Sequence, residues 1–362
     1  TGTLEGGSYD GAISNSGTFI YSSTTDQVLS GIISGDGALT KQEDSSLTLS
    51  GANTYTGATL ISAGVLRAQN DTALGTTASG TTVASGAALE LNDLDDGTAI
   101  AIGAEALSLA GTGISNGGAL RNIAGNNSYA GAITLTADTR INSDSGTLTL
   151  NVASGAAITG TFNLTFGGAG NITVNGVIGN GSGTVTKDGA GTLTLTADNT
   201  YTGATTISDG IVAISHANAL GTTAGSTSVS SGATLSISHD TSIDVPEPIT
   251  ISGPGETVSS ATVGVIRFTG SGTYTYSGAI TLTGTSSTIS STNSGGSTTF
   301  SGGINATSSG SQSLTISTTT DDFVISGEIG GTTRPSTVDI SAIGTGRTLS
   351  INQDISSTGN QT

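Results

Sequence analysis

Residues 47–76 read LTLSGANTYTGATLISAGVLRAQNDTALGT, and residues 193–222 read LTLTADNTYTGATTISDGIVAISHANALGT. The offset of 146 between their first positions, 47 and 193, also aligns Lys41 with Lys187 and Arg121 with Arg267. Five of the 7 tyrosines open a Tyr-x-Gly-Ala phrase, namely Tyr9, Tyr55, Tyr129, Tyr201 and Tyr276. The chain is therefore a tandem array of a unit of about 146 residues.

Each unit divides into two similar halves. The tyrosine phrases at positions 55, 129, 201 and 276 are almost evenly spaced, whereas the first gap, from Tyr9 to Tyr55, is clearly shorter. The missing stretch, about 25 residues, leaves the flanking pattern intact, as the loss of one whole coil from a solenoid would. A half-unit then holds three coils of about 24 residues each, which predicts about 15 coils for the chain.

The local pattern predicts strands and turns. Short runs such as LTLS at Leu47 and AITLT at Ala132 alternate in the period of two that is typical of strands. Glycine-rich clusters such as SGDG at Ser34 separate these runs and indicate corners. The run AIAIGAEALSLAG from Ala99 contains glycine and alternates, so we expect strand there as well. The fold class predicted is all-β, a parallel β-helix whose equivalent positions stack about 4.8 Å apart.

We expect one continuous β-helix over residues 1–362. Its predicted internal units are a partial repeat at 1–29, a first full repeat at 30–175, a second at 176–326 and the start of a third at 327–362. Neither end shows a polar cap, and the chain has no methionine. We therefore expect the terminal coils to stack on further repeats of the same polypeptide or on neighbouring copies, end to end.

Composition excludes several classes of protein. The 4 prolines and the alternating apolar runs argue against a disordered linker, although the chain has 57 glycines. A net charge of −18 excludes a nucleic-acid binder, which needs a basic surface. The absence of cysteine removes disulfides and thiolate metal sites. No apolar run reaches the roughly 20 residues of a membrane-spanning helix.

The two quoted stretches resemble the autotransporter-associated β-strand repeat. That pattern runs Leu-Thr-Leu-x-Gly-x-Asn-Thr-Tyr-x-Gly-x-Thr, then a glycine-centred turn, an aliphatic pair and Ala-Leu-Gly. Each stretch matches over its whole length; the second departs where Ala197 stands in place of Gly51. The resemblance implies a right-handed parallel β-helix in a secreted passenger of type V secretion. It also implies an extracellular place on the bacterial surface and a role in adhesion or display, with host or cell-surface glycans or proteins as partners.

Candidate catalytic residues were weighed against structural roles. Asp95–Asp96 and Asp321–Asp322 are the acidic pairs, but adjacent strand residues point to opposite faces, so neither doublet forms a cooperating pair alone. Lys41, Lys187, Arg121 and Arg267 recur at equivalent positions, which favours a structural role. His216 and His239 recur in neither unit and have no GxSxG setting. We expect no catalytic residue, no metal ligand and no cofactor-binding residue.

Two weaker ligand hypotheses remain. Acidic turns such as DLDDG are candidates for weak calcium binding, whereas GGAGN at Gly167 has Ile172 where the calcium nonapeptide needs aspartate. Ice binding needs Thr-x-Thr on the same strand of every coil. The motif at Thr134 and Thr192 is not matched in ALEL at Ala88 or IVAIS at Ile211.

The sequence therefore favours a structural or adhesive segment of a large bacterial surface protein. The segment would act as a stalk, passenger or fibre component and not as an enzyme. The alternative is a β-helical carbohydrate-active lyase or hydrolase, which rests on analogy of fold alone.

Overall fold

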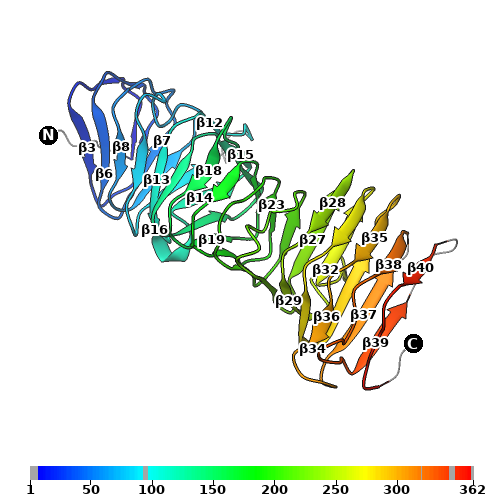
Figure 1. Cartoon of the computed structure of the whole chain (residues 1–362). Helices are drawn as coiled ribbons and strands as arrows, with labels where there is room; N and C mark the ends of the chain where they lie inside the picture. Colours follow the sequence, from blue (N-terminus) through cyan, green and yellow to red (C-terminus); the bar gives the residue numbers. More distant parts are fainter. Residues whose placement is uncertain (1–6, 93–96, 319, 342–346, 360–362) are drawn as a thin grey trace. The chain divides into compact units, whose positions relative to one another are not determined.

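The computed structural model describes residues 7–92, 97–318, 320–341 and 347–359. It divides into two compact units, Thr1–Gly183 and Thr184–Thr362. Within each unit the chain winds past three faces, of which the second has no strand in some coils, and strands of successive coils pair in parallel (Figure 1). The prediction of an all-β parallel solenoid of about 15 coils is confirmed. The predicted repeat boundaries at 29/30, 175/176 and 326/327 stay predictions.

In the first unit, the strands are grouped by face in the order in which each coil meets them. The first face comprises β1 (Ser8–Tyr9), β4 (Gln27–Leu29), β7 (Ser46–Leu49), β9 (Val65–Ala68), β11 (Ala88–Asn92), β14 (Leu120–Ala124), the second half of β16 (Ile133–Ser143) and β19 (Leu164–Gly167). The second face comprises β2 (Ile13–Ser14), β5 (Ile33–Ser34), β12 (Ala101–Ile102), β15 (Asn126–Tyr129), β17 (Thr147–Leu150) and β20 (Asn171–Val174). The third face comprises β3 (Thr18–Ser22), β6 (Ala38–Gln42), β8 (Thr59–Ile61), β10 (Thr81–Val83), β13 (Leu107–Gly111), the first half of β16, β18 (Ala156–Thr159) and β21 (Val177–Gly179).

In the second unit, the faces are named by the motif residues that they share with the first. The first face comprises β23 (Thr192–Leu195), β25 (Ile211–Ile214), β27 (Thr234–His239), β32 (Ile266–Gly270), the second half of β34 (Ile280–Ser291), β37 (Ser313–Thr318) and β39 (Thr337–Ser341). The second face comprises β28 (Ser242–Val245), β33 (Thr273–Tyr276), β35 (Ser297–Phe300), β38 (Asp322–Ile325) and β40 (Leu349–Ile351). The third face comprises β22 (Val185–Lys187), β24 (Thr205–Ile207), β26 (Thr227–Val229), β29 (Ile249–Gly253), the first half of β34 and β36 (Ile304–Ala306).

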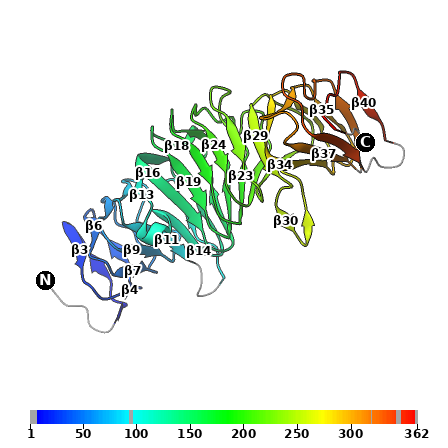
Figure 2. The same cartoon turned by 90° about the horizontal axis from the view of Figure 1, so that it is seen from below.

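Two elements depart from this pattern. A short 3-10 helix, η1 (Ile114–Asn116), precedes β14 in the first unit. At the corresponding place of the second unit, β30 (Thr257–Val258) and β31 (Ala261–Thr262) form an antiparallel hairpin before β32, and β30 projects from the stack in Figure 2. Among the described residues, no helix is long and apolar enough to cross a membrane.

The interior consists of aliphatic ladders. Leu47, Leu66, Leu89 and Leu120 stand in register on successive strands of the first face, and each is 0% exposed. Burying one leucine contributes about 1.5–3 kcal/mol, so the ladders supply the core that the narrow coils need. In the second unit, aromatic rings add to the filling: Phe300 lies 5.5 Å from Phe268 and 5.3 Å from Phe323, between ring centroids.

Coil length varies more than the sequence predicted. In the first unit, the register runs from Leu47 to Leu66, then to Leu89 and to Leu120, so each step is longer than the one before. In the second unit, the steps from Leu193 to Val212, to Leu235 and to Ile266 repeat the same three lengths. The uniform coil length that the sequence predicted is thus correct only on average. The longest coil contains the η1 segment in the first unit and the β30–β31 hairpin in the second, while Leu89 stays paired with Leu120 and Leu235 with Ile266.

Replacing Leu89 by alanine should lower the free energy of unfolding by about 2–5 kcal/mol, because it opens a cavity in the first-face ladder. Leu60→Ala is the matched control, since Leu60 lies on the outer side of β8 and is 39% exposed. Urea unfolding followed by circular dichroism measures both. Equal losses for the two variants would show that Leu89 does not lie in the core.

Candidate functional site

The most specific side-chain contacts of the chain belong to its repeated motif. Asn53 is 1% exposed; its side-chain oxygen accepts a hydrogen bond from the Ile33 backbone N–H, 2.8 Å away in the coil before. Its side-chain nitrogen donates to the Ala73 carbonyl oxygen, 2.7 Å away in the coil after. In the second unit, Asn199 donates in the same way to Ala219, at 2.6 Å. The motif asparagine therefore joins successive coils at a corner where strands are lacking.

The tyrosine of the motif fills the interior of the coil, and its hydroxyl is hydrogen-bonded to a threonine of the same motif. The Tyr55 hydroxyl is hydrogen-bonded to the Thr59 hydroxyl at 2.7 Å, and Tyr201 to Thr205 at the same distance. Both rings are 0% exposed, and burial raises the pKa of each phenol. This pairing explains why the phrase fixes both Tyr and Thr, four positions apart.

The Ala-Leu-Gly phrase covers the tyrosine from the next coil. Gly75 has a φ of +85°, and a Cβ there would lie 2.4 Å from the Tyr55 carbonyl oxygen and 3.0 Å from its ring. Gly221 has the same relation to Tyr201. Only glycine fits so close to the tyrosine ring. The number of residues between the Tyr-x-Gly-Ala phrase and the Ala-Leu-Gly phrase therefore corresponds to one coil.

Lys41 and Lys187 are buried and bind backbone oxygens. The Lys41 ammonium donates to the carbonyls of Gln42 at 2.6 Å, Glu43 at 2.7 Å and Ala63 at 3.3 Å. Lys187 contacts the carbonyls of Asp188, Gly189 and Asp209 in the same manner. Burial lowers the pKa of Lys41, an effect that the nearby Asp44 and Glu43 oppose. Each lysine thus ties a turn of its own coil to a turn of the next.

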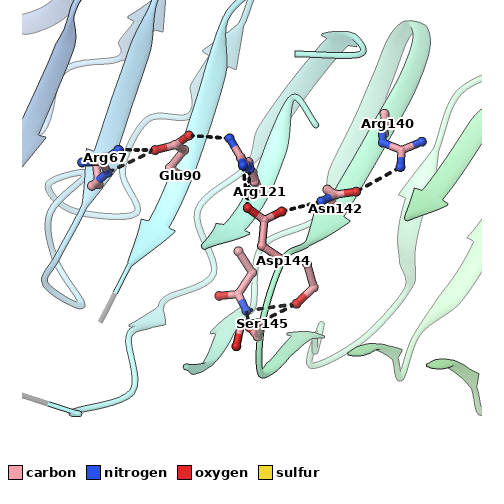
Figure 3. A network of polar contacts seen from close by, with 9 residues as sticks. Arg67, Glu90, Arg121, Arg140, Asn142, Asp144 and Ser145 are labelled. Carbon is pink, nitrogen blue, oxygen red and sulfur yellow. Dashed lines mark hydrogen bonds and ion pairs between the residues drawn. The ribbon is translucent and has the colours of Figure 1, made fainter. Parts of the chain in front are cut away.

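A ladder of charged residues lies on the outer side of the first face in the first unit (Figure 3). Arg67, Glu90, Arg121 and Asn142 occupy equivalent positions of four successive coils. Glu90, whose side chain is 5% exposed, accepts from Arg67 at 2.8 Å and from Arg121 at 3.3 Å. Arg121 also pairs with Asp144 at 2.5 Å, and Asp144 accepts from Asn142. Hydrogen bonding to Asp144 is the main cause that raises the pKa of Arg121.

The second unit keeps one member of this charged ladder. Arg267 is equivalent to Arg121, but its register neighbours on the two adjacent coils are Ser236 and Ser290. The repeated arginine therefore does not have a constant role. In the first unit it links coils through carboxylates, whereas no ion pair of Arg267 is present among the described residues.

The other charged candidates are not brought together. Asp321 is buried and accepts from the hydroxyls of Ser291 and Thr298, at 2.8 and 2.6 Å. Asp322 instead accepts from the Thr348 backbone N–H and hydroxyl, which lowers its pKa. The two carboxylates point to opposite faces, as strand alternation predicts. Asp95–Asp96 lie outside the described residues.

Both histidines make local turn contacts. The ring nitrogen Nδ1 of His216 accepts from the Asn218 backbone N–H at 3.2 Å, and that of His239 accepts from the Thr241 backbone N–H at 3.0 Å. In the part of the chain that the structure describes, no group of three or more histidine or carboxylate residues has an arrangement that could hold a metal ion. Weak calcium binding stays an untested prediction.

Hydroxyl groups form a regular row on one outer surface of the second unit. Thr206, Ser228, Thr250 and Thr281 stand in register on four successive strands of the third face. The Thr-x-Thr motifs in the sequence did not reveal this row, because the segments at Ala88, Thr192 and Ile211 belong to the first face, whereas the segment at Thr134 belongs to the third. In the first unit, the corresponding row is interrupted by Ile20 and Leu60.

The repeats in the sequence point to the tyrosine and the lysine, whereas the roles of Asn53, Thr59 and Gly64 emerge only in the structure. Gly64 turns the corner beneath the Lys41 ammonium with a φ of +68°. The letters Asn-x-Tyr, which recur at Asn53, Asn127 and Asn199, were the available signal. The Asn127 oxygen accepts from the Ile100 backbone N–H at 2.7 Å, so the third copy bonds across coils as well.

Comparison with known families identifies the motif. The model of the passenger-associated transport repeat matches residues 39–68 and 185–214. Each match runs from the strand that bears the buried lysine, through the Asn-x-Tyr phrase, to the next first-face strand. The matched residues are thus those whose contacts join successive coils.

One relative is a bacterial autotransporter adhesin. The chain is 36% identical over 136 residues to the adhesin BmaC autotransporter of Brucella suis biovar 1 (strain 1330). The match covers 36% of this chain and 4% of that relative, so the chain spans a small part of the relative's length. No solved structure matches the chain.

Replacing Asn53 by alanine should destabilise the first unit by about 2–4 kcal/mol, because the Ile33 N–H and the Ala73 carbonyl both lose a buried partner. Asn70→Ala is the control, since the hydrogen bonds of the Asn70 side chain within the described part of the chain are local, to Thr72 in the same turn. Urea unfolding gives the two losses. The role assigned to Asn53 fails if both variants lose the same small amount.

Proposed function

Because the chain carries two copies of the passenger-associated transport repeat, we propose that it is a structural and adhesive segment of a large, secreted bacterial surface protein. Its place is the outer cell surface, and its role is non-enzymatic. The observation that supports this most strongly is the use of the repeated residues: Asn53 and Lys41 donate hydrogen bonds to the next coil, and the buried Tyr55 ring lies against Gly75 of that coil. The adhesin relative supports the same role.

The outer side chains are the part of each unit that can contact a partner. They differ between repeats, since the first unit has the charged ladder where the second has mainly hydroxyl groups. A scaffold whose inner residues repeat while its outer residues vary can present different surfaces without a change of fold. The partners proposed are glycans or proteins of other cells.

Adhesion can be measured with the chain displayed on a non-adherent bacterium through an unrelated outer-membrane anchor. We expect several-fold more bacteria to remain on an epithelial monolayer than with the anchor alone, at equal surface amounts of a shared tag. Retention equal to that of the anchor alone would contradict the adhesive role and leave only a spacer.

The enzyme alternative is tested separately. The protein is incubated with polygalacturonate or hyaluronate, and new reducing ends and unsaturated sugar ends are measured. We expect no increase over buffer. Cleavage that disappears in the Asp321→Asn/Asp322→Asn variant would overturn the non-enzymatic proposal, whatever the adhesion assay shows.

A further inference from the structure

Each unit buries one glutamate in a cluster of hydroxyl groups. In the first unit, Glu105 lies between β12 and β13 and is 3% exposed. Its oxygen Oε1 accepts from the Thr81 hydroxyl, 2.5 Å away in the coil before. Thr81 is in register with Thr59, which holds Tyr55. The Tyr129 hydroxyl has no hydrogen-bond partner among the described residues.

The second unit repeats this cluster with the same residue types. Glu247 lies just before β29 and is 2% exposed. Its oxygen Oε1 accepts from Thr227, 3.4 Å away, and Thr227 is in register with Thr205, which holds Tyr201. The Tyr276 hydroxyl donates to the Glu247 backbone carbonyl at 2.8 Å. The Oε2 atom of Glu247 has no hydrogen-bond partner among the described residues.

Sequence alignment at the offset of the repeat does not reveal the pair, because it places Glu105 opposite Ile251 and not opposite Glu247. The structural equivalence is nevertheless close. Each glutamate stands two positions before a third-face strand residue, Leu107 or Ile249, that is in register with the threonine it contacts. Two repeats that differ in most outer side chains therefore keep the same buried carboxyl.

In the part of the chain that the structure describes, neither carboxyl has a compensating cation. The titratable groups that face Glu105 are the phenols of Tyr55 and Tyr129, and those that face Glu247 are the phenols of Tyr201 and Tyr276. Among the described residues, no lysine, arginine or histidine contributes to the pKa shift of either carboxyl. An ionised carboxylate without a cation is costly in such an interior, whereas the neutral acid is tolerated.

We propose that Glu105 and Glu247 are buried proton switches, one in each unit, which keep the surrounding coils tightly stacked when protonated and loosen them when ionised. Loosening is the route by which water reaches the charge, because the clusters contain only hydroxyl groups. The switch would act on the third-face strands that flank each glutamate, β10 and β13 in the first unit and β26 and β29 in the second.

The direction of the pH effect follows from linkage. Burial raises the pKa of Glu105 to about 7 and that of Glu247 to about 7, from 4.5, and the threonine hydroxyls oppose the shift. Since the folded pKa lies above the unfolded one, the stabilisation is fully present below pH 4.5 and is lost as the pH rises through 7. The unfolding equilibrium constant rises by roughly tenfold for each unit of difference between the two pKa values.

Urea unfolding of the whole chain at pH 5, 7 and 9 tests the proposal. The wild-type midpoint should fall mainly between pH 5 and pH 7 and change little between pH 7 and pH 9, because the proton-binding difference exists between the unfolded and the folded pKa. Glu105→Gln/Glu247→Gln should lose most of this fall, because glutamine cannot ionise. Asp36→Asn, at an exposed turn, is the control and should keep the wild-type profile. An identical fall in the wild type and the double variant would overturn the proposal.

Direct titration of the glutamate carboxyls by NMR tests the proposal even if the double variant does not fold. The chain has seven glutamates, so side-chain carboxyl ¹³C labelling gives seven signals. Two should titrate near pH 7, and each should disappear in one of the single variants, Glu105→Gln or Glu247→Gln. Titration of all seven signals between about pH 4 and 5, the ordinary range for glutamate, would contradict the proposal.

Discussion

Parallel stacking of one coil on the next is the constraint on which the rest of each unit depends. Apart from the β30–β31 hairpin, the described strands pair with strands of the coil before or after, so equivalent positions must accept equivalent side chains. Leu47, Leu66, Leu89 and Leu120 show the result on the inner side. The abundance of small and β-branched residues follows from this geometry, because a narrow interior has no room for a large globular core.

At the corners the coils lack the regular hydrogen bonds of strands, and residues of the repeated motif supply hydrogen bonds there instead. Asn53 supplies hydrogen bonds where the chain leaves the strand pattern, and Lys41 supplies donors where three carbonyls converge at a turn. Gly75 lets the chain pass close over the Tyr55 ring. The residues that looked most specific in the sequence are therefore specific for the fold. The outer residues do not share this constraint. The neighbours of the two equivalent arginines show this, since Arg121 lies beside Glu90 and Asn142, whereas Arg267 lies beside Ser236 and Ser290.

The sequence allowed the fold class, the repeat and the approximate number of coils to be predicted, because these depend on periodicity. It did not show that coils of three different lengths follow one another, since corner loops change length without disturbing the ladders. The alignment of Arg121 with Arg267 predicted the same structural role for both arginines. Arg121 forms ion pairs with Glu90 and Asp144, whereas the register neighbours of Arg267 are serines. The cluster around Glu105 could not be predicted from the sequence, because its residues come from four different coils.

The most direct test of the account is a cross-link between outer positions of adjacent coils. The chain contains no cysteine, so paired substitutions introduce the only thiols. Thr82 and Ser108 are register neighbours, and Ser108 is the neighbour of Thr134 in the following coil. Coils about 4.8 Å apart suit a disulfide, whereas about 9.6 Å is too far. Mild oxidation should therefore close Thr82→Cys/Ser108→Cys and leave Thr82→Cys/Thr134→Cys reduced; equal closure of both pairs, or closure of the second alone, would contradict the stacking register.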